Sequence, residues 1–299
     1  MTANNATAVP PAPMASPAVR QLARERGIDL QTLAIRLDRQ YLTESDIAAS
    51  HFPPTPAHTR ATPDRESLGA GEAVSLTRLE KTAAANLLDS HQQIPIVTHH
   101  DAVDVSAIEA FRNSLAAEAA ERKTRLSALS LHVLALARAM AAFPRFNSAL
   151  TDGGESLWLK RDIHIGIAVD TPHGLMVPVI QNADKIGLWQ IAEAIADQTA
   201  RARERKLAPS EMSGAGMSIS SLGGIGGRAF TPMINPPEVA ILGITRIRME
   251  PVWDGEQFQP RPICPLDLSY DHRVINGAAA ARFMGHYTEL LETPRKLLF

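Results

Sequence analysis

One residue well suited to proton transfer lies near the C-terminal end of the chain. His272 follows the apolar run 263–270 and precedes Asn276 and Gly277, where an alanine-rich segment begins. A histidine delivered at a strand end lies where functional groups gather in α/β proteins, and the ordinary histidine pKa of about 6.5 suits proton transfer near neutral pH. Most histidines are surface or core residues, so the interpretation depends on the neighbours of His272.

A second segment, 217–227, offers several hydrogen-bond donors close together. It is an apolar stretch with serines at 218, 220 and 221, and it runs into glycines at 223, 224, 226 and 227. Such a segment could stabilise a developing oxyanion. It could equally be a tight turn whose serines only satisfy the backbone. The residues alone leave both interpretations open.

Three other chemistries fit the sequence less well. Segment 224–229 matches the relaxed dinucleotide fingerprint, but prolines at 232, 236 and 237 exclude the helix that must follow it. No Gly-x-Ser-x-Gly motif marks an α/β-hydrolase. His99 and His100 would point to opposite faces of a strand, so we expect solvated strand-end residues and no metal site. Cys264 lies in a predicted buried strand and is expected to pack there.

Composition limits the classes of protein further. The 299 residues carry a net charge of −2, which gives no argument for binding nucleic acid or a membrane surface. The single cysteine excludes a disulfide framework. The chain has no apolar run of about 18 residues, as a transmembrane helix needs, and residues 1–5 have neither the basic start nor the apolar core of a signal peptide. We therefore expect a cytoplasmic protein.

Changes in composition along the chain predict four segments. Residues 1–14 read as a flexible linker, and Ser16 with Pro17 is a strong helix start. A second short helix is expected from Thr43, so that 15–50 form a mini-domain of two helices. Residues 51–71 are rich in Pro and Ala and read as a second linker. Residues 72–299 form one large domain.

Within the large domain, helix and strand patterns alternate, which favours an α/β fold with a mixed sheet. The helix over 126–143 is apolar on nearly every face and should be buried. Further helices are expected over 105–123, 188–206 and 277–292. Strands are expected over 156–160, 164–170, 175–180, 217–221, 239–249 and 263–270.

Several motifs together resemble the catalytic domain of the dihydrolipoamide acyltransferases, the core subunits of 2-oxo acid dehydrogenase complexes. Residues 272–277 match that family's pattern His-Arg-x-x-(Asp/Asn)-Gly, and 218–223 match its serine motif. Additional matches lie at 143–147, 169–175, 230–232 and 235–243, so the resemblance covers 72–299 in order. Asn276 and the sequence at 220–223 are most similar to the bacterial acetyl-transferring members.

The resemblance implies a fold like that of chloramphenicol acetyltransferase, assembled as homotrimers whose active sites lie between subunits. By this resemblance His272 is the general base and Ser220 donates to the oxyanion. Asn276 supports the site, with Arg78 as its expected partner, and Phe230 lines the substrate channel. The large domain is thus expected to be an α/β chloramphenicol-acetyltransferase-like mixed-sheet domain, preceded by the small two-helix domain.

The implied reaction exchanges an acyl group, expected to be acetyl, between dihydrolipoyl and coenzyme A thiols. A thiol with a pKa of about 8.5 is mostly protonated at pH 7, so it needs a base such as His272 to attack a thioester. One oxyanion donor such as Ser220 can contribute roughly 3 kcal/mol. The expected setting is a pyruvate dehydrogenase complex. The alternative is a non-catalytic scaffold subunit of such a complex.

Segment 15–30 resembles the first half of a peripheral subunit-binding domain, whose partners are dehydrogenase or decarboxylase subunits. The stretch 32–42 lacks the glycines of that domain's loop. The sequence also shows no lipoyl domain, so the lipoyl group is expected on another polypeptide, with acetyl-CoA as the second substrate. Alternatively, the chain is a fragment or acts outside the usual complex. Residues 297–299 are apolar, and we expect them to dock on a neighbouring trimer in a 24-subunit core.

Overall fold

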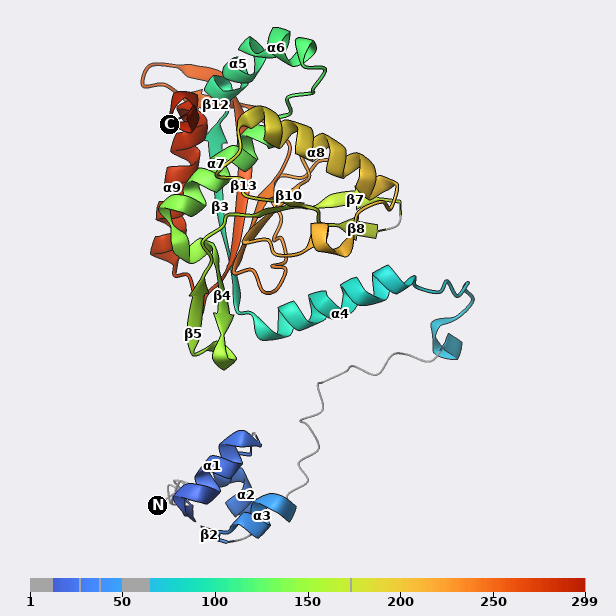
Figure 1. The fold of residues 1–299 in the computed structure, drawn as a ribbon, viewed down its shortest axis with the longest axis vertical. Coiled ribbons are helices and arrows are strands. Elements are labelled where there is room, and N and C mark those ends of the chain that lie inside the picture. The colour runs from blue at the N-terminus through green and yellow to red at the C-terminus, as the bar shows by residue number, and fades with distance from the viewer. Residues whose placement is uncertain (1–12, 27, 38, 50–64, 173, 299) are drawn as a thin grey trace, which may run out of the picture. The chain divides into compact units, whose positions relative to one another are not determined.

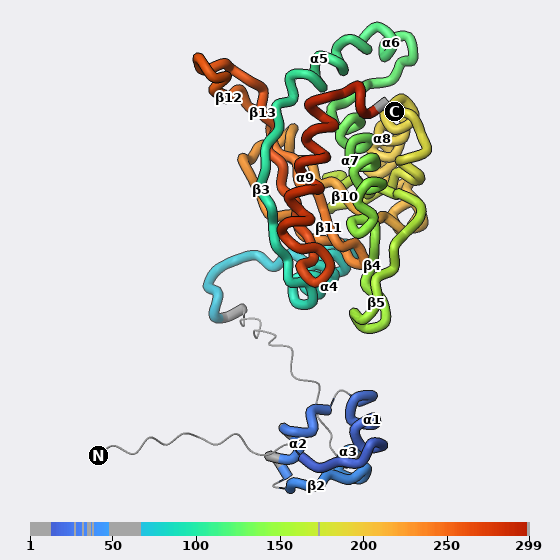
Figure 2. The backbone as a smooth tube through the Cα atoms, turned by 90° about the vertical axis from the view of Figure 1, so that its left-hand side faces the viewer, coloured from blue at the N-terminus to red at the C-terminus, as the bar shows by residue number. Residues whose placement is uncertain are grey.

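The computed structural model describes residues 13–26, 28–37, 39–49, 65–172 and 174–298 (Figures 1 and 2). The chain divides into two compact units, Met1–Val74 and Ser75–Phe299. Segments 1–14 and 51–71, which were expected to be linkers, lie largely outside the described residues. Among the residues described, every helix is too short or too polar to cross a bilayer.

The first unit is a small group of helices with its own core. Ser16 caps the first helix as predicted, because its hydroxyl accepts a hydrogen bond from the backbone N–H of Val19 at 3.2 Å. The structure contains a third helix that the sequence did not predict. The elements of this first unit are β1 (Met14–Ala15), α1 (Pro17–Glu25), α2 (Leu30–Leu37), β2 (Tyr41–Leu42) and α3 (Glu44–Ala49). Its buried side chains are Val19, Ala23, Leu33, Leu42 and Ile47.

The second unit is built on a seven-stranded mixed sheet whose longest strand is β13 (Phe258–Asp271). The first half of β13 pairs with β12 (Arg248–Trp253). Its second half lies between β3 (Ile96–Asp104) and β11 (Ala240–Ile244), and all three pairings are antiparallel. Beyond β11 the sheet continues with β10 (Met217–Ser221), β6 (Ile165–Ile167) and β9 (Val179–Ile180).

Helices cover one face of this sheet. The two helices α7 (Ala128–Ala142) and α9 (Gly277–Glu292) run side by side against it (Figures 1 and 2). Side chains alternate along a strand, so Leu266 and Leu268 of β13 point into this core, where Phe283 and Tyr287 of α9 are also buried. The predicted buried helix is confirmed, since ten residues of α7 are buried.

Some predicted elements are divided in the structure. The expected helix over 105–123 ends at Ser114 and starts again at Ala116, giving α5 (Ser106–Ser114) and α6 (Ala116–Glu121). The expected helix over 188–206 is α8 (Leu188–Arg203). The strands expected over 164–170 and 175–180 are each divided in two. One part of each lies in the seven-stranded sheet and the other part in a two-stranded hairpin. The small hairpins are β4 (Ser148–Thr151) with β5 (Ser156–Leu159), and β7 (Val169–Thr171) with β8 (Gly174–Met176).

Helix α4 (Arg78–Gln93) was not predicted, although its start is encoded locally. The Thr77 hydroxyl accepts from the Glu80 N–H at 3.2 Å, and the Glu80 carboxylate accepts from the Thr77 N–H at 2.7 Å. This reciprocal cap fixes the first turn. Leu87 and Leu88 remain 49% and 53% exposed, so no buried apolar face of the usual kind marks the helix.

The chain ends in a short 3-10 helix, Pro294–Leu298, after α9. Leu297 is 1% exposed and belongs to the core of its own unit. The expectation that residues 297–299 dock on a neighbouring trimer is therefore wrong for Leu297, because that side chain is already buried. Phe299 lies outside the described residues.

Candidate active site

His272 lies in the turn between β13 and α9. Its backbone N–H donates to the carbonyl of Pro95 at 3.1 Å, which ties the turn to the start of β3. Its ring centroid lies 5.9 Å from that of Tyr270, and the residue is exposed. The imidazole is therefore accessible to a ligand or to a second chain.

The residues on either side of His272 make this turn rigid. The Asp271 carboxylate is buried and accepts from the Arg273 backbone N–H at 3.0 Å. It also binds the Arg273 guanidinium, with Nη2 2.6 Å from Oδ2, and this hydrogen bonding raises the pKa of Arg273. The backbone N–H groups of Val274 and Ile275 donate to the Asp271 carbonyl. His272 thus projects from a turn with few degrees of freedom.

Asn276 is the N-cap of α9. Its Oδ1 accepts from the Ala279 N–H at 2.9 Å. The residue is exposed, four positions after His272. Asn276 therefore caps α9 and lies close in the sequence to His272, the predicted base.

Within one chain the structure does not bring Arg78 to Asn276. Arg78 is exposed and begins α4, while the other end of that helix leads through Pro95 toward the turn that carries His272. The 16 residues of α4 at 1.5 Å each place its two ends about 24 Å apart. Over the described ranges, no hydrogen bond or ion pair joins Arg78 to Asn276. The predicted pairing thus requires two chains.

Ser220 lies near the end of β10, on the sheet face opposite the helices. Met217 and Ile219 point into the core, so Ser218 and Ser220 point the other way. Ser218 is buried and donates to Glu238 Oε1 at 2.9 Å. Ser220 is half-buried, and its hydroxyl makes no hydrogen bond to any residue that the structure describes. That hydroxyl is therefore free to donate to a ligand.

A row of four paired residues crosses this face. Ser220 pairs with Gly243, Gly243 with Asp267, and Asp267 with His100. The ring of Phe230 lies on Gly243, because a Cβ at that glycine would be 2.8 Å from ring carbon Cε1. The predicted channel residue Phe230 is thus beside the predicted oxyanion donor Ser220.

The same register separates His272 from Ser220 within one chain. His272 follows Asp267 by five residues, and a strand rises about 3.3 Å per residue, so the offset along β13 is about 17 Å. Strand β10 is two strands away from β13, which adds about 10 Å across the sheet. The two side chains cannot span this distance. They can meet only if they come from different chains.

Glu238 is a buried carboxyl group that the sequence did not mark as a site residue. Its Oε1 accepts from Ser218 and from Asn235, whereas Oε2 is buried without a hydrogen-bond partner among the described residues. Burial raises the pKa of Glu238 to about 7, against the opposing effects of these two hydrogen bonds and of the Lys160 charge. A glutamate directly before the apolar run 239–244 was the available signal.

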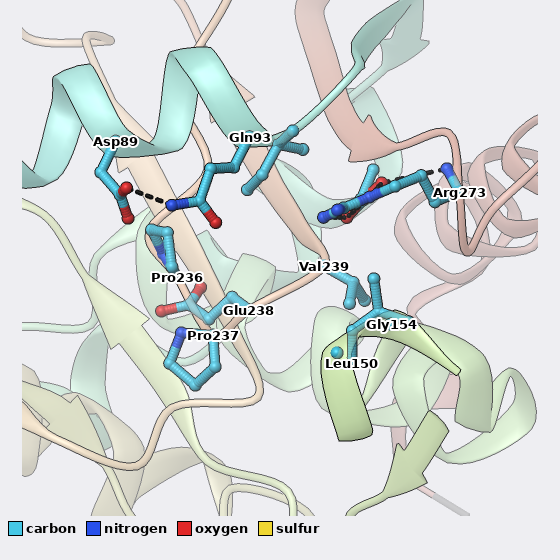
Figure 3. A pocket seen from close by; sticks show the side chains of 12 residues that line it. Asp89, Gln93, Leu150, Gly154, Pro236, Pro237, Glu238, Val239 and Arg273 are labelled. Carbon is cyan, nitrogen blue, oxygen red and sulfur yellow. Dashed lines mark hydrogen bonds and ion pairs between the residues drawn. The ribbon is translucent and has the colours of Figure 1, made fainter. Parts of the chain in front are cut away.

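Two cavities border Glu238. The larger is about 350 Å³ and lies between α4, the segment 236–239, the β4–β5 hairpin and the Asp271–Arg273 turn (Figure 3). The smaller is about 240 Å³ and lies toward segment 212–215. A third cavity, about 300 Å³, is lined by His132 and Cys264. His272 and Ser220 line none of these three cavities.

The structure also bears on the alternative chemistries. Residues 222–239 contain no helix, as expected when the dinucleotide interpretation was rejected. Cys264 is 0% exposed, and burial raises its pKa to about 12, which keeps the thiol protonated. The prediction of solvated histidines holds for His100, whose side chain is 54% exposed, but the expected strand-end position does not. That residue lies within β3, and its Nδ1 is 2.5 Å from the buried Asp267 Oδ1.

Two known families match parts of this chain. The family of 2-oxoacid dehydrogenases acyltransferases, through its catalytic domain, matches residues 69–299. The chain belongs to this family. A second family, described as an E3 binding domain, matches residues 13–34 in the first unit.

Two curated relatives have the same name, dihydrolipoyllysine-residue acetyltransferase component of pyruvate dehydrogenase complex. The protein from Pseudomonas aeruginosa is 43% identical over 303 residues, which cover 95% of this chain and 54% of the relative. The protein from Azotobacter vinelandii is 43% identical over 299 residues, covering 95% of this chain and 47% of the relative. The chain therefore spans about half the length of the curated relatives it matches.

Solved acyltransferase structures superpose on most of the chain. Two are 47% identical with a TM-score of 0.77, covering 80% of this chain and 98% of the solved chain. One is the cubic core of a pyruvate dehydrogenase multienzyme complex. The other belongs to a study of the roles of a serine, a histidine and an asparagine in the catalytic mechanism of Azotobacter vinelandii dihydrolipoamide acetyltransferase. The expected mixed α/β acyltransferase fold is confirmed.

Proposed function

We propose that this chain transfers an acetyl group between dihydrolipoyl and coenzyme A thiols as the core component of a pyruvate dehydrogenase complex. The names of the curated relatives support the acyl group and the complex. The observation that carries the proposal is the spacing of three residues along the chain. In the Azotobacter enzyme the studied serine precedes the histidine by 52 residues and the asparagine follows it by four. Ser220, His272 and Asn276 have the same intervals.

In this proposal His272 removes the proton from the attacking thiol. The imidazole is exposed on a rigid turn, so it can approach a thiol held by another chain. The thiolate sulfur attacks the thioester carbonyl, and the proton passes to the imidazole and then to the leaving sulfur. Because both thiols can bind together, no covalent acyl-enzyme is needed.

Ser220 supplies the hydrogen bond to the oxyanion that this attack creates. Its hydroxyl is half-buried and points to the sheet face opposite α7 and α9. A donor already oriented toward the developing charge stabilises the transition state more than the ground state. Asn276 begins α9 and thereby fixes the turn that carries His272.

The estimated separation of His272 and Ser220 supports an active site between two chains. We propose a homotrimer in which each subunit offers its His272 to the Ser220 of a neighbour. Assembly of such trimers into a cubic core of 24 subunits follows the architecture named for one structural relative. The lipoyl substrate is carried on a lipoyl-bearing protein, and the first unit contributes to binding partner subunits of the complex.

The transferase assay with acetyl-CoA and dihydrolipoamide tests this function. The wild-type chain should transfer the acetyl group, and His272→Ala should lower kcat at least about a hundredfold, as expected for loss of a general base. Ser220→Ala should cost about 3 kcal/mol of transition-state stabilisation, again about a hundredfold.

A matched control is His286→Ala, which removes a histidine about 14 Å along α9 from the start of that helix and should leave kcat unchanged. Undiminished activity in His272→Ala would contradict the mechanism. Full-sized assemblies of the wild-type chain that transfer no acetyl, succinyl or branched-chain acyl group would instead indicate a scaffold subunit.

A further inference from the structure

Asp267 is a buried carboxylate on the same sheet face as Ser220. It is 1% exposed, and its two oxygens bind two different parts of the chain. Oδ1 lies 2.5 Å from Nδ1 of His100 in β3. Oδ2 accepts from the backbone N–H of Phe230 at 3.1 Å. A buried carboxylate is costly unless its oxygens are satisfied, so the position of each partner depends on the other.

The Phe230 ring occupies the space that a side chain at Gly243 would fill. A Cβ at Gly243 would lie 2.8 Å and 2.9 Å from two ring carbons of Phe230, and 3.1 Å from the Cβ of Asp267. Only glycine leaves room for the ring at this position. Adjacent strands are about 4.8 Å apart, so the ring edge stands next to Ser220.

The segment that carries Phe230 has few other attachments. On one side, the Arg228 carbonyl accepts from the Thr245 hydroxyl at 3.1 Å. On the other side, the Ile234 carbonyl accepts from the Ser90 hydroxyl at 2.7 Å. Between these anchors, residues 229–233 make one hydrogen bond to the described parts of the chain, from the Phe230 N–H to Asp267. Asp267 is thus the one hydrogen-bonding partner of segment 229–233 among the described residues.

We propose that Asp267 and His100 are positioning residues that hold Phe230 against Gly243, and that the ring held there limits the length of the acyl group beside Ser220. This inference rests on the proposed function. The carbon chain of the acyl group is bonded to the carbonyl whose oxygen faces Ser220, so an immobile aromatic wall on the Gly243 side restricts that chain. Apolar walls discriminate between substrates that differ by a few methylenes by about tenfold or more.

Acyl-length selectivity measures the effect of this wall. In Asp267→Ala, the ratio of kcat/KM for acetyl-CoA to that for butyryl-CoA should fall at least about fivefold, because the ring is no longer fixed. Asp267→Asn should restore a ratio close to that of the wild type. Its amide retains an oxygen for the Phe230 N–H and offers an N–H to an unprotonated Nδ1 of His100.

Ser269→Ala is the matched control. Ser269 is also buried in β13, and its hydroxyl lies 2.8 Å from that of Thr98 in β3. The control therefore removes a cross-strand contact of the same two strands without touching Phe230, and the selectivity ratio should stay unchanged. A double-mutant cycle adds a second check. In a Phe230→Ala background, Asp267→Ala should change the ratio no further, because the ring it positions is gone.

Hydrogen exchange at the Phe230 amide tests the positioning without any catalytic activity. Exchange should be at least about tenfold faster in Asp267→Ala than in the wild type, and unchanged in Ser269→Ala. An amide equally protected in Asp267→Ala would overturn the inference. So would an unchanged selectivity ratio in that variant. A wild-type chain inactive with both donors would contradict the proposed function, while the exchange result would still decide the role of Asp267.

Discussion

Three buried carboxyl groups lie on or beside the sheet face opposite α7 and α9, and they differ in how their oxygens are satisfied. Asp267 binds two partners and Asp271 binds the backbone and side chain of one, Arg273. Glu238 is 3% exposed and has a buried oxygen without a partner among the described residues. Burial therefore raises the pKa of Glu238 to about 7.

The raised pKa predicts how Glu238 affects stability as the pH changes. The unfolded chain releases this proton near the ordinary glutamate pKa, whereas the folded chain retains it up to about pH 7. The free energy of unfolding should therefore fall as the pH rises from about 4.5 to 7 and level off above that, by roughly 3 kcal/mol in total. Glu238→Gln removes this titration, so its stability relative to the wild type should rise over the same range.

Chemical unfolding at several pH values between 4.5 and 8 measures this difference. Glu256→Gln is the control, because Glu256 is exposed on the β12–β13 hairpin. A difference between Glu238→Gln and the wild type that stays constant with pH would show that the buried carboxyl group does not retain its proton.

At this scale, the sequence revealed residues whose role depends on local context. His272 follows an apolar strand and Ser220 lies near the end of one, each within a recognisable motif, so both could be chosen as candidates from the sequence. The pairing of His100 with Asp267 joins residues 167 positions apart and depends on the register between β3 and β13. Hydrophobic periodicity does not encode that register, so the sequence did not predict the contact between His100 and Asp267.

At the scale of elements, α9 shows how a helix boundary and a candidate site residue coincide. Asn276 caps the helix through its hydrogen bond with the Ala279 N–H. Asn276→Ala should lower stability by about 1 kcal/mol, the usual cost of losing an N-cap. Kcat should also fall, because the turn with His272 ends at this residue. Asn276→Asp keeps a capping oxygen and should preserve both properties.

Thermal unfolding and the transferase assay on the two variants separate these effects. If Asn276→Ala lost activity with no loss of stability, Asn276 would act on the substrates or on another residue. Equal losses in the Asp and Ala variants would argue against the capping role.

Prediction of the elements succeeded where burial leaves a periodic trace. The structure begins α9 at Gly277 and strand β10 at Met217, as the sequence indicated, because strong apolar patterns mark both. Helix α4 was missed because only one of its 16 residues, Ser90, is buried in the single chain, so no periodic apolar pattern marks it. Its cap residues, Thr77 and Glu80, were the only local signal.

At the scale of the whole molecule, the single chain is incomplete as a catalyst in our proposal. The register of β10, β11 and β13 places Ser220 about 17 Å along the strands and two strands across from His272. Helix α4 also exposes about half of Leu87 and Leu88, an apolar surface that assembly of several chains would cover. Sequence could not reveal this separation, which follows from the order and register of the strands.

Mixing two inactive variants tests the shared active site most directly. His272→Ala and Ser220→Ala subunits would be co-expressed with different tags, purified as mixed assemblies and assayed with acetyl-CoA and dihydrolipoamide. In a random mixture of equal amounts, about one interface in four combines an intact His272 with an intact Ser220 from the neighbouring chain. Activity should therefore recover to roughly a quarter of the wild-type value. Mixed assemblies no more active than the two variants measured separately would contradict a site shared between subunits.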